Sequence, residues 1–150
     1  MSLDVPIFTI GYEATTPDRL VAALRAAGVR RLVDVRALAN SRRPGFAKRA
    51  LSAALAEAGI GYEHLRALGT PAAGRAAVRA GRPAVMRAIF AAHLAGTEAQ
   101  AALAGLTETA RHEPVCLLCL EADPAQCHRT LVAEAVAADT GLPVAHLHPA

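Results

Sequence analysis

Short, largely apolar segments of strand length alternate with helix-length segments along the whole chain, and this alternation constrains the fold more than any other feature. Most of the short segments are continuously apolar, so both faces of each strand are expected to be buried, as in a parallel sheet covered by helices. The pattern predicts an α/β fold: a single three-layer domain with a mainly parallel sheet of about five strands and helices on both faces. The predicted strands are Val5–Ile10, Arg31–Val35, Ile60–Leu65, Val115–Leu120 and Val144–Leu147.

Helix signals fill the segments between these strands. Thr16 and Pro17 are residue types favoured at the first positions of a helix, and Gly28 is the type favoured just after its end. The Ala-rich stretch after the third strand is a candidate helical insertion or lid. Further helices are predicted over Lys48–Ala58, Val78–His93 and Glu98–Arg111, and from Asp123-Pro124 to the region of Ala138.

The composition excludes several classes of protein. Of the 150 residues, 53% are hydrophobic, which suffices for one domain with a sizeable core, and the 19% that are charged are too well mixed for wholesale disorder. No apolar stretch is long enough to cross a bilayer, and Met1–Phe8 lacks signal-peptide character, so we expect a cytoplasmic protein with no membrane partner. The positive charges are fifteen arginines and Lys48, and the net charge of +3 permits an anionic partner without requiring one.

Three cysteines, Cys116, Cys119 and Cys127, lie within twelve residues. An odd number gathered in one segment argues against a disulfide framework. Cys116 and Cys119 are three residues apart in a strand and should point to opposite faces, so a zinc knuckle is disfavoured and neither a metal nor a cofactor is expected. Cys127 and His128 are adjacent on a predicted helix and should not face each other, which disfavours a thiol nucleophile with a histidine base. We expect the cysteines to be small buried residues.

Polar residues gather where the predicted strands end, which is where open parallel sheets bind their ligands. Glu13 directly follows the first strand and is either a general acid or base or a hydrogen-bond partner of a loop arginine. Asp34 lies between two valines inside the second strand. A buried carboxylate there either pairs with Arg36 or Arg129 or serves as a catalytic group.

An arginine-rich loop follows the second strand and is either a solvated basic loop or part of an anion site. Arginine forks match phosphate and carboxylate oxygens, and Phe46 within this loop offers a ring on which a base could stack. We expect Arg36, Arg42, Arg43 and Arg129 to converge on one anion. With Glu13 and Asp34 as the candidate catalytic carboxylates, the predicted substrate- or anion-binding residues are Tyr12, Arg36, Ser41, Arg42, Arg43, Phe46, Lys48, Glu121, Cys127, His128 and Arg129.

Five motifs together resemble the domain of unknown function 488 family (DUF488) over most of the chain, from Thr9 to about Val136. The resemblance implies an α/β fold and a shared site made of these motifs, but no established activity. Many members carry Gly-His-Ser where this chain has Gly-Tyr-Glu, so it looks like the Gly-Tyr-Glu branch and a histidine role at position 12 is not implied. The motifs are Thr9-Ile-Gly-Tyr-Glu13, Val33-Asp-Val-Arg36, Ser41-Arg-Arg-Pro-Gly-Phe46, Tyr62–Leu65 with Leu68-Gly69, and Cys119-x-Glu-x-x-Pro-x-x-Cys-His-Arg129.

Three classes of function fit these features. The first, which we favour, is an enzyme acting on nucleic acid or a nucleotide, with hydrolysis of an N-glycosidic bond as in DNA base repair as one such reaction. The second is a non-catalytic module that binds a nucleotide or another anion. The third is a thiol or metal enzyme built on Cys119, Cys127 and His128. The chain has no Walker loop, dinucleotide-binding glycine motif or Gly-x-Ser-x-Gly motif, which argues against the common enzymes that carry them.

Overall fold

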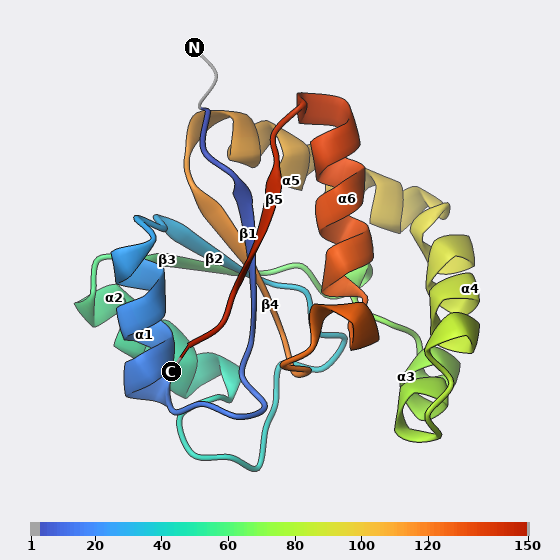
Figure 1. Ribbon diagram of the computed structural model, residues 1–150, viewed down its shortest axis with the longest axis horizontal. Coiled ribbons are helices and arrows are strands. Elements are labelled where there is room, and N and C mark those ends of the chain that lie inside the picture. The colour runs from blue at the N-terminus through green and yellow to red at the C-terminus, as the bar shows by residue number, and fades with distance from the viewer. Residues whose placement is uncertain (1–3, 150) are drawn as a thin grey trace.

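The computed structural model describes residues 4–149, and its centre is a five-stranded parallel sheet (Figure 1). Every neighbouring pair of strands is parallel, and the spatial order is β3-β2-β4-β1-β5. The α/β fold expected from the alternating sequence pattern is therefore confirmed. The strands are β1 (Ile7–Gly11), β2 (Arg31–Asp34), β3 (Gly61–His64), β4 (Val115–Cys119) and β5 (Val144–Leu147).

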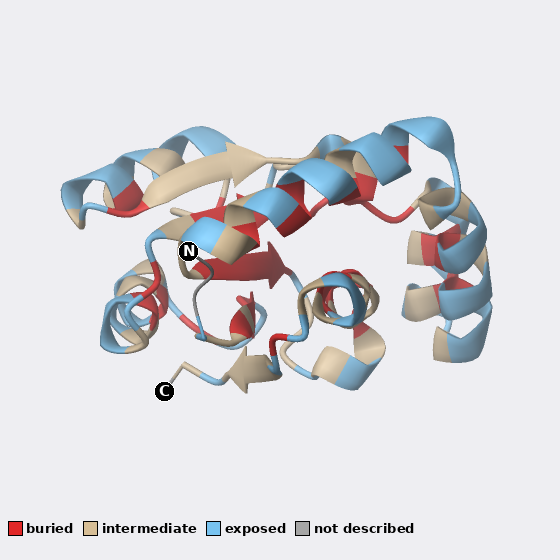
Figure 2. Cartoon of the chain, turned by 90° about the horizontal axis from the view of Figure 1, so that it is seen from above, coloured by how far each residue is buried: buried red, intermediate tan, exposed pale blue. Residues whose placement is uncertain are grey.

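Helices cover both faces of this sheet, and each face has its own hydrophobic core. The helices α1 (Pro17–Ala26) and α2 (Lys48–Glu57) pack on one face, and α5 (Thr97–His112) and α6 (Arg129–Thr140) pack on the other (Figure 1). Successive side chains of β4 point to opposite faces of the sheet. Cys116 therefore lies in the core under α1 and α2, and Cys119 lies in the core under α5 and α6. The central strands are buried while the outer surfaces of the helices are exposed (Figure 2). None of the helices in residues 4–149 has the length and apolar character needed to cross a membrane.

Two helical segments differ from the sequence prediction by more than one or two residues at an end. The segment expected to be one helix over Val78–His93 is a pair of helices, α3 (Ala72–Arg79) and α4 (Pro83–Leu94), separated at Gly81, whose φ of 73° lies in the left-handed region. This pair extends beyond one end of the sheet, to the right in Figure 1.

The helix expected to begin at Asp123-Pro124 begins instead at Arg129. A single 3₁₀ turn, η2 (Pro124–Gln126), comes first, and Asp123 caps it by accepting a hydrogen bond from the backbone N–H of Ala125 at 2.9 Å. Cys127 then adopts an extended conformation before the helix starts. A second 3₁₀ turn, η1 (Arg66–Leu68), follows β3.

The segments that follow the three central strands lead to helices on opposite faces of the sheet. The chain passes from β1 into α1 and from β2 into α2, all on one face, whereas it passes from β4 into α6 on the other face. Since β4 lies between β2 and β1, its carboxyl end borders a topological switch on both sides. Open α/β sheets bind ligands in the crevice that forms at such a switch.

Gly11 lets the loops after β1 and β4 meet at this crevice. A Cβ atom at position 11 would lie 1.9 Å from the carbonyl oxygen of Glu121, so only glycine allows the two backbones to approach this closely. Two hydrogen bonds extend the contact past the strands, from the N–H of Tyr12 to Cys119 O at 3.2 Å and from the N–H of Glu13 to Leu120 O at 2.8 Å.

We therefore predict that Gly11→Ala destabilises the protein, while Gly105→Ala stabilises it. Gly105 lies exposed inside α5, where a Cβ atom would meet no neighbour within 4 Å, so alanine should raise the free energy of unfolding by about 0.5–1 kcal/mol. The alanine at position 11 should lower it by about 1–3 kcal/mol, because the backbone around Glu121 must move. Urea unfolding of both variants measures this difference, and equal stabilities would contradict the close packing at Gly11.

Candidate functional site

A cavity of about 230 Å³ opens at the carboxyl ends of β1, β2 and β4. Each strand contributes the residues that follow it: Tyr12 after β1, Arg36 after β2, and Cys119 with Glu121 at the end of β4. The other side of the cavity is formed by α3 and the segment before it, and by the segment that leads into α6. These contribute Thr70, Arg75, Val78, Arg79, Gln126 and His128.

Cys119, Cys127 and His128, which we call the Cys–His cluster, meet at the wall of this cavity. The Nδ1 atom of His128 lies 3.6 Å from the sulfur of Cys119 and 3.9 Å from the sulfur of Cys127, and all three atoms lie within 4.8 Å of one another. The Nε2 atom of His128 lies 2.7 Å from the carbonyl oxygen of Val35, which can only accept a hydrogen bond. Nε2 therefore carries a proton, and in the neutral ring Nδ1 presents its lone pair to the two sulfur atoms.

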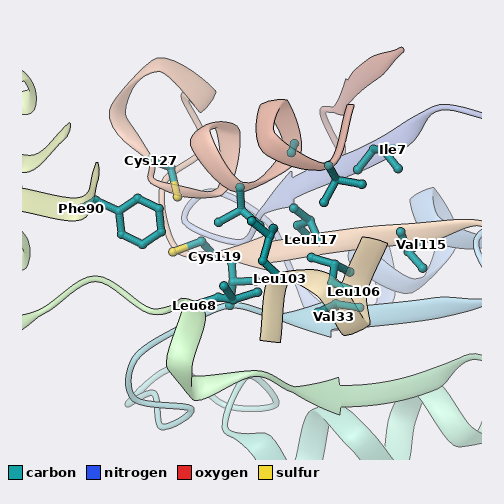
Figure 3. Packing of buried hydrophobic residues seen from close by; sticks show 14 of the residues in the cluster. Ile7, Val33, Leu68, Phe90, Leu103, Leu106, Val115, Leu117, Cys119 and Cys127 are labelled. Carbon is teal, nitrogen blue, oxygen red and sulfur yellow. The ribbon is translucent and has the colours of Figure 1, made fainter. Parts of the chain in front are cut away.

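This arrangement corrects the expectation that Cys127 and His128 do not face each other. That expectation placed both residues on one helix, but Cys127 is extended and only His128 begins the helical turn. The change of backbone conformation directs both side chains toward Cys119. Figure 3 shows the sulfur atoms of Cys119 and Cys127 in the same region beside Phe90, whose ring centroid lies 5.0 Å from that of His128. Cys116 faces the opposite core, as its position in the strand predicted.

The cluster changes the ionisation of its members. Burial opposes ionisation of the Cys127 thiol, but hydrogen bonds with Cys119 and His128 bring its pKa well below the usual value. The same interactions with Cys127 raise the pKa of His128 against the effect of burial. The pKa of Cys119 is raised by its hydrogen bond with Cys127 and by burial. Burial, followed by the neighbouring Cys127, raises the pKa of Glu121 to about 7.

Asp34 lies in a buried ion pair with Arg36, the first of its two predicted roles, and does not line the cavity, which argues against its second predicted role as a catalytic carboxylate. It is 0% exposed, and its two oxygen atoms accept from Nε and Nη2 of Arg36 at 2.8 and 2.6 Å. The backbone N–H of Arg36 and the hydroxyl group of Tyr62 donate to the same carboxylate. With four donors around it, Asp34 has no free position for a substrate, and the ion-pair alternative with Arg36 is the one that the structure contains.

Phe46 is a core residue and does not present its ring to a ligand. It is 1% exposed, and its ring stacks on Tyr12 with the centroids 4.7 Å apart. Arg36 donates from Nη1 to the carbonyl oxygen of Phe46 at 2.8 Å, and the guanidinium group of Arg43 lies over the Phe46 ring. The expected base-stacking role of Phe46 is therefore wrong, because the ring closes the core beneath the loop instead.

The four arginines expected to converge on one anion lie at the same edge of the sheet but do not share a free site. Arg43 donates to the carbonyl oxygens of Tyr12, Glu13 and Thr15, and Arg36 is paired with Asp34. Arg129 is 0% exposed and donates to the carbonyl oxygen of Glu121 at 2.6 Å. Arg42 is exposed. These guanidinium groups mainly hold loops together, since backbone carbonyls and a carboxylate take their donors.

The remaining predicted residues divide between the loops and the cavity. Glu13 is exposed and accepts at Oε1 from the N–H of Ala122 at 3.1 Å, so it holds the two loops together. Ser41 accepts from the N–H of Arg43 at 3.1 Å, and Lys48 is exposed at the start of α2. Of the predicted binding residues, the cavity is lined by Tyr12, Arg36, Glu121 and His128.

Sequence reasoning missed the part of the cavity that α3 provides. Arg75 and Arg79 are four residues apart on this helix and so lie on one face, which lines the cavity. Arg75 donates to the carbonyl oxygen of Thr70 at 2.8 Å. The spacing of the two arginines was a usable signal, but the predicted helix began at Val78 and did not include both.

The roles found for Asp34 and Glu13 give a prediction about stability. Asp34→Asn should lower the free energy of unfolding by about 3–5 kcal/mol, because it leaves the buried guanidinium group of Arg36 without a charged partner. Glu13→Gln should change it by less than about 1 kcal/mol, because the amide oxygen can still accept from Ala122 at an exposed position. Denaturant unfolding compares the two variants, and a larger loss for Glu13→Gln would overturn these roles.

Comparison with known proteins shows the family of this chain. No curated protein and no solved structure has significant similarity to it. The family model described as the domain of unknown function DUF488 matches residues 16–136, a segment that includes α3, the Cys–His cluster and the Asp34–Arg36 pair. The chain therefore belongs to the DUF488 family.

Proposed function

We propose that this protein is an enzyme that acts on a small anionic molecule, with a nucleotide as the substrate class. One observation carries the proposal: a single cavity is lined both by Cys119 and His128 of the Cys–His cluster and by the two arginines on one face of α3. The cluster supplies reactive groups and the arginines supply charge recognition. Both belong to one site at the topological switch of the sheet.

Arg75 and Arg79 favour an anionic ligand. Neither forms an ion pair with any residue in the described range, so no carboxylate among residues 4–149 compensates their charges. Arg36 also lines the cavity, but Asp34 compensates its charge. Guanidinium groups with unused donors bind phosphate and carboxylate oxygens through forked hydrogen bonds.

Two features favour catalysis over simple binding. The Cys–His cluster brings together two sulfur atoms and an imidazole nitrogen, an arrangement that anion binding alone does not require. Glu121 lines the same cavity, and its Oε2 atom is buried without a hydrogen-bond partner in the described part of the chain. A carboxylate in this position can transfer a proton to or from a bound molecule.

The proposal includes hydrolysis of an N-glycosidic bond, but it assigns the proton transfer to a different carboxylate. Glu121 replaces Glu13 and Asp34 as the working carboxylate, because it is the one that lines the cavity. The cavity volume suits a small molecule or a single extruded base. A free nucleotide in the cytoplasm and a base in nucleic acid, as in DNA repair, are the two sources that experiments should separate.

Replacing the α3 arginines should weaken binding of the substrate class. Arg75→Ala and Arg79→Ala should each raise the Kd for a nucleoside monophosphate by about 10-fold or more, the effect of losing one charged hydrogen bond. Arg87→Ala is the matched control, because Arg87 is exposed on α4 and does not line the cavity. Isothermal titration calorimetry measures these affinities, with inorganic phosphate and a short single-stranded oligonucleotide as further probes.

Three outcomes decide between the functions. Equal losses in the α3 variants and in Arg87→Ala would contradict anion binding in the cavity. Binding that needs the oligonucleotide and falls steeply with salt would identify nucleic acid as the source of the substrate. If nucleotides bind but are recovered unchanged after incubation with the wild type, the protein is a binding module and the catalytic part of the proposal is wrong.

A further inference from the structure

We propose that the Cys–His cluster binds one zinc ion through Cys119, Cys127 and His128, with the fourth position of the metal facing the cavity. Metal binding follows from the cluster alone, whereas the part assigned to the ion in catalysis rests on the function proposed above.

The distances within the cluster match those between the ligands of one tetrahedral zinc. With Zn–S bonds of about 2.3 Å and Zn–N bonds of about 2.0–2.1 Å, tetrahedral geometry separates sulfur from nitrogen by about 3.6 Å. The observed separations from Nδ1 of His128 are 3.6 Å to Cys119 and 3.9 Å to Cys127. The two sulfur atoms lie within 4.8 Å of each other, and two thiolates on one tetrahedral zinc are about 3.8 Å apart, so binding would draw the sulfur atoms onto the ion. Thiolate and imidazole are ligands that zinc prefers.

The hydrogen bond of His128 to Val35 supports the same assignment. A histidine that binds a metal through one nitrogen commonly donates from the other to a carbonyl or a carboxylate, which fixes the ring and its tautomer. His128 makes this contact at 2.7 Å with the carbonyl oxygen of Val35, just past the end of β2. Its ring is buried and packs against Phe90, so Nδ1 is held in place before any metal arrives.

The position of the cluster favours a catalytic zinc over a structural one. Structural sites usually have four protein ligands, whereas catalytic sites have three and leave one position for water or substrate. Within the described residues this group contains three ligand atoms, and two of its members, Cys119 and His128, line the cavity. The open position would therefore face the bound substrate.

Glu121 lies where such a site needs a proton acceptor. It is two residues beyond Cys119, lines the cavity and has a buried oxygen without a partner among the described residues. In N-glycosidic hydrolysis, a water molecule on zinc would give one proton to this carboxylate, its oxygen would form a bond to the sugar carbon, and the bond from that carbon to the base nitrogen would break. Glu121 would then return the proton to the leaving group, so that the reaction consumes one water molecule overall.

Cobalt titration of the reduced, metal-free full-length protein tests metal binding without any substrate. Co²⁺ should bind in a 1:1 ratio, produce the thiolate charge-transfer and tetrahedral d–d absorption of a site with two thiolates, and be displaced by Zn²⁺. Loss of a residue that only hydrogen-bonds to a metal ligand typically weakens metal binding by about 10- to 100-fold. Removal of a ligand itself should weaken Co²⁺ binding by more than this in each of the variants Cys119→Ala, Cys127→Ala and His128→Ala. Cys116→Ala should leave binding unchanged, because this thiol lies on the other face of β4.

The results separate metal binding from the function proposed above. Circular dichroism identifies any variant that does not fold. If a variant fails to fold, alkylation of the wild type replaces it as the test, and Zn²⁺ should protect Cys119 and Cys127 from the alkylating reagent. Absence of saturable Co²⁺ binding, or equal weakening by Cys116→Ala, would overturn the zinc site while leaving anion binding untouched. The double variant Arg75→Ala/Arg79→Ala should bind Co²⁺ as tightly as the wild type. Loss of Co²⁺ binding in this folded variant would contradict a metal site made of Cys119, Cys127 and His128.

Discussion

The buried pair of Asp34 and Arg36 holds together the edge of the sheet on which the site is built. The carboxylate of Asp34 accepts hydrogen bonds from Arg36 and from Tyr62 of the neighbouring strand β3. The guanidinium group in turn donates to Phe46 in the loop before α2. Through Phe46 the contact reaches Tyr12, which stacks on that ring and lines the cavity. One ion pair thus links β2, β3, the arginine-rich loop and the end of β1, and it fixes one wall of the cavity.

Much of the fold follows from patterns that act over short distances. Continuous apolar runs such as Val115–Leu120 are long enough for strands and too short for helices, and glycines such as Gly28 and Gly141 end the helices between them. The side-chain alternation in β4 also follows from sequence, since it separates Cys116 from Cys119. The errors occur at helix boundaries, where a single residue such as Gly81 decides between one helix and two.

The site was harder to predict, because its residues are combined by conformations that no local pattern reports. The position of Glu121 and His128 at the carboxyl edge was predictable from the order of strands. The pairing of Cys127 with His128 depends on one extended residue between a 3₁₀ turn and a helix, which sequence propensities do not resolve. The loop arginines were assigned to a ligand because the sequence shows their charge. It does not show which backbone carbonyl oxygens will accept their hydrogen bonds, and in the structure these carbonyls take most of the donors of Arg43.

The two halves of the cavity belong to parts of the molecule with very different constraints. Cys119, His128 and Glu121 lie at the central strand or in the segment that leaves it, where close backbone contacts at Gly11 leave little freedom. Arg75 and Arg79 lie on α3, which packs chiefly against α4 beyond the end of the sheet. A related chain can therefore change the residues at positions 75 and 79 of this helical hairpin, while Phe90 on α4 must stay packed against His128 to keep the cluster in place. Under the proposed function, the cavity-lining face of α3 is where substrate preference could diverge within the family while the Cys–His cluster stays the same.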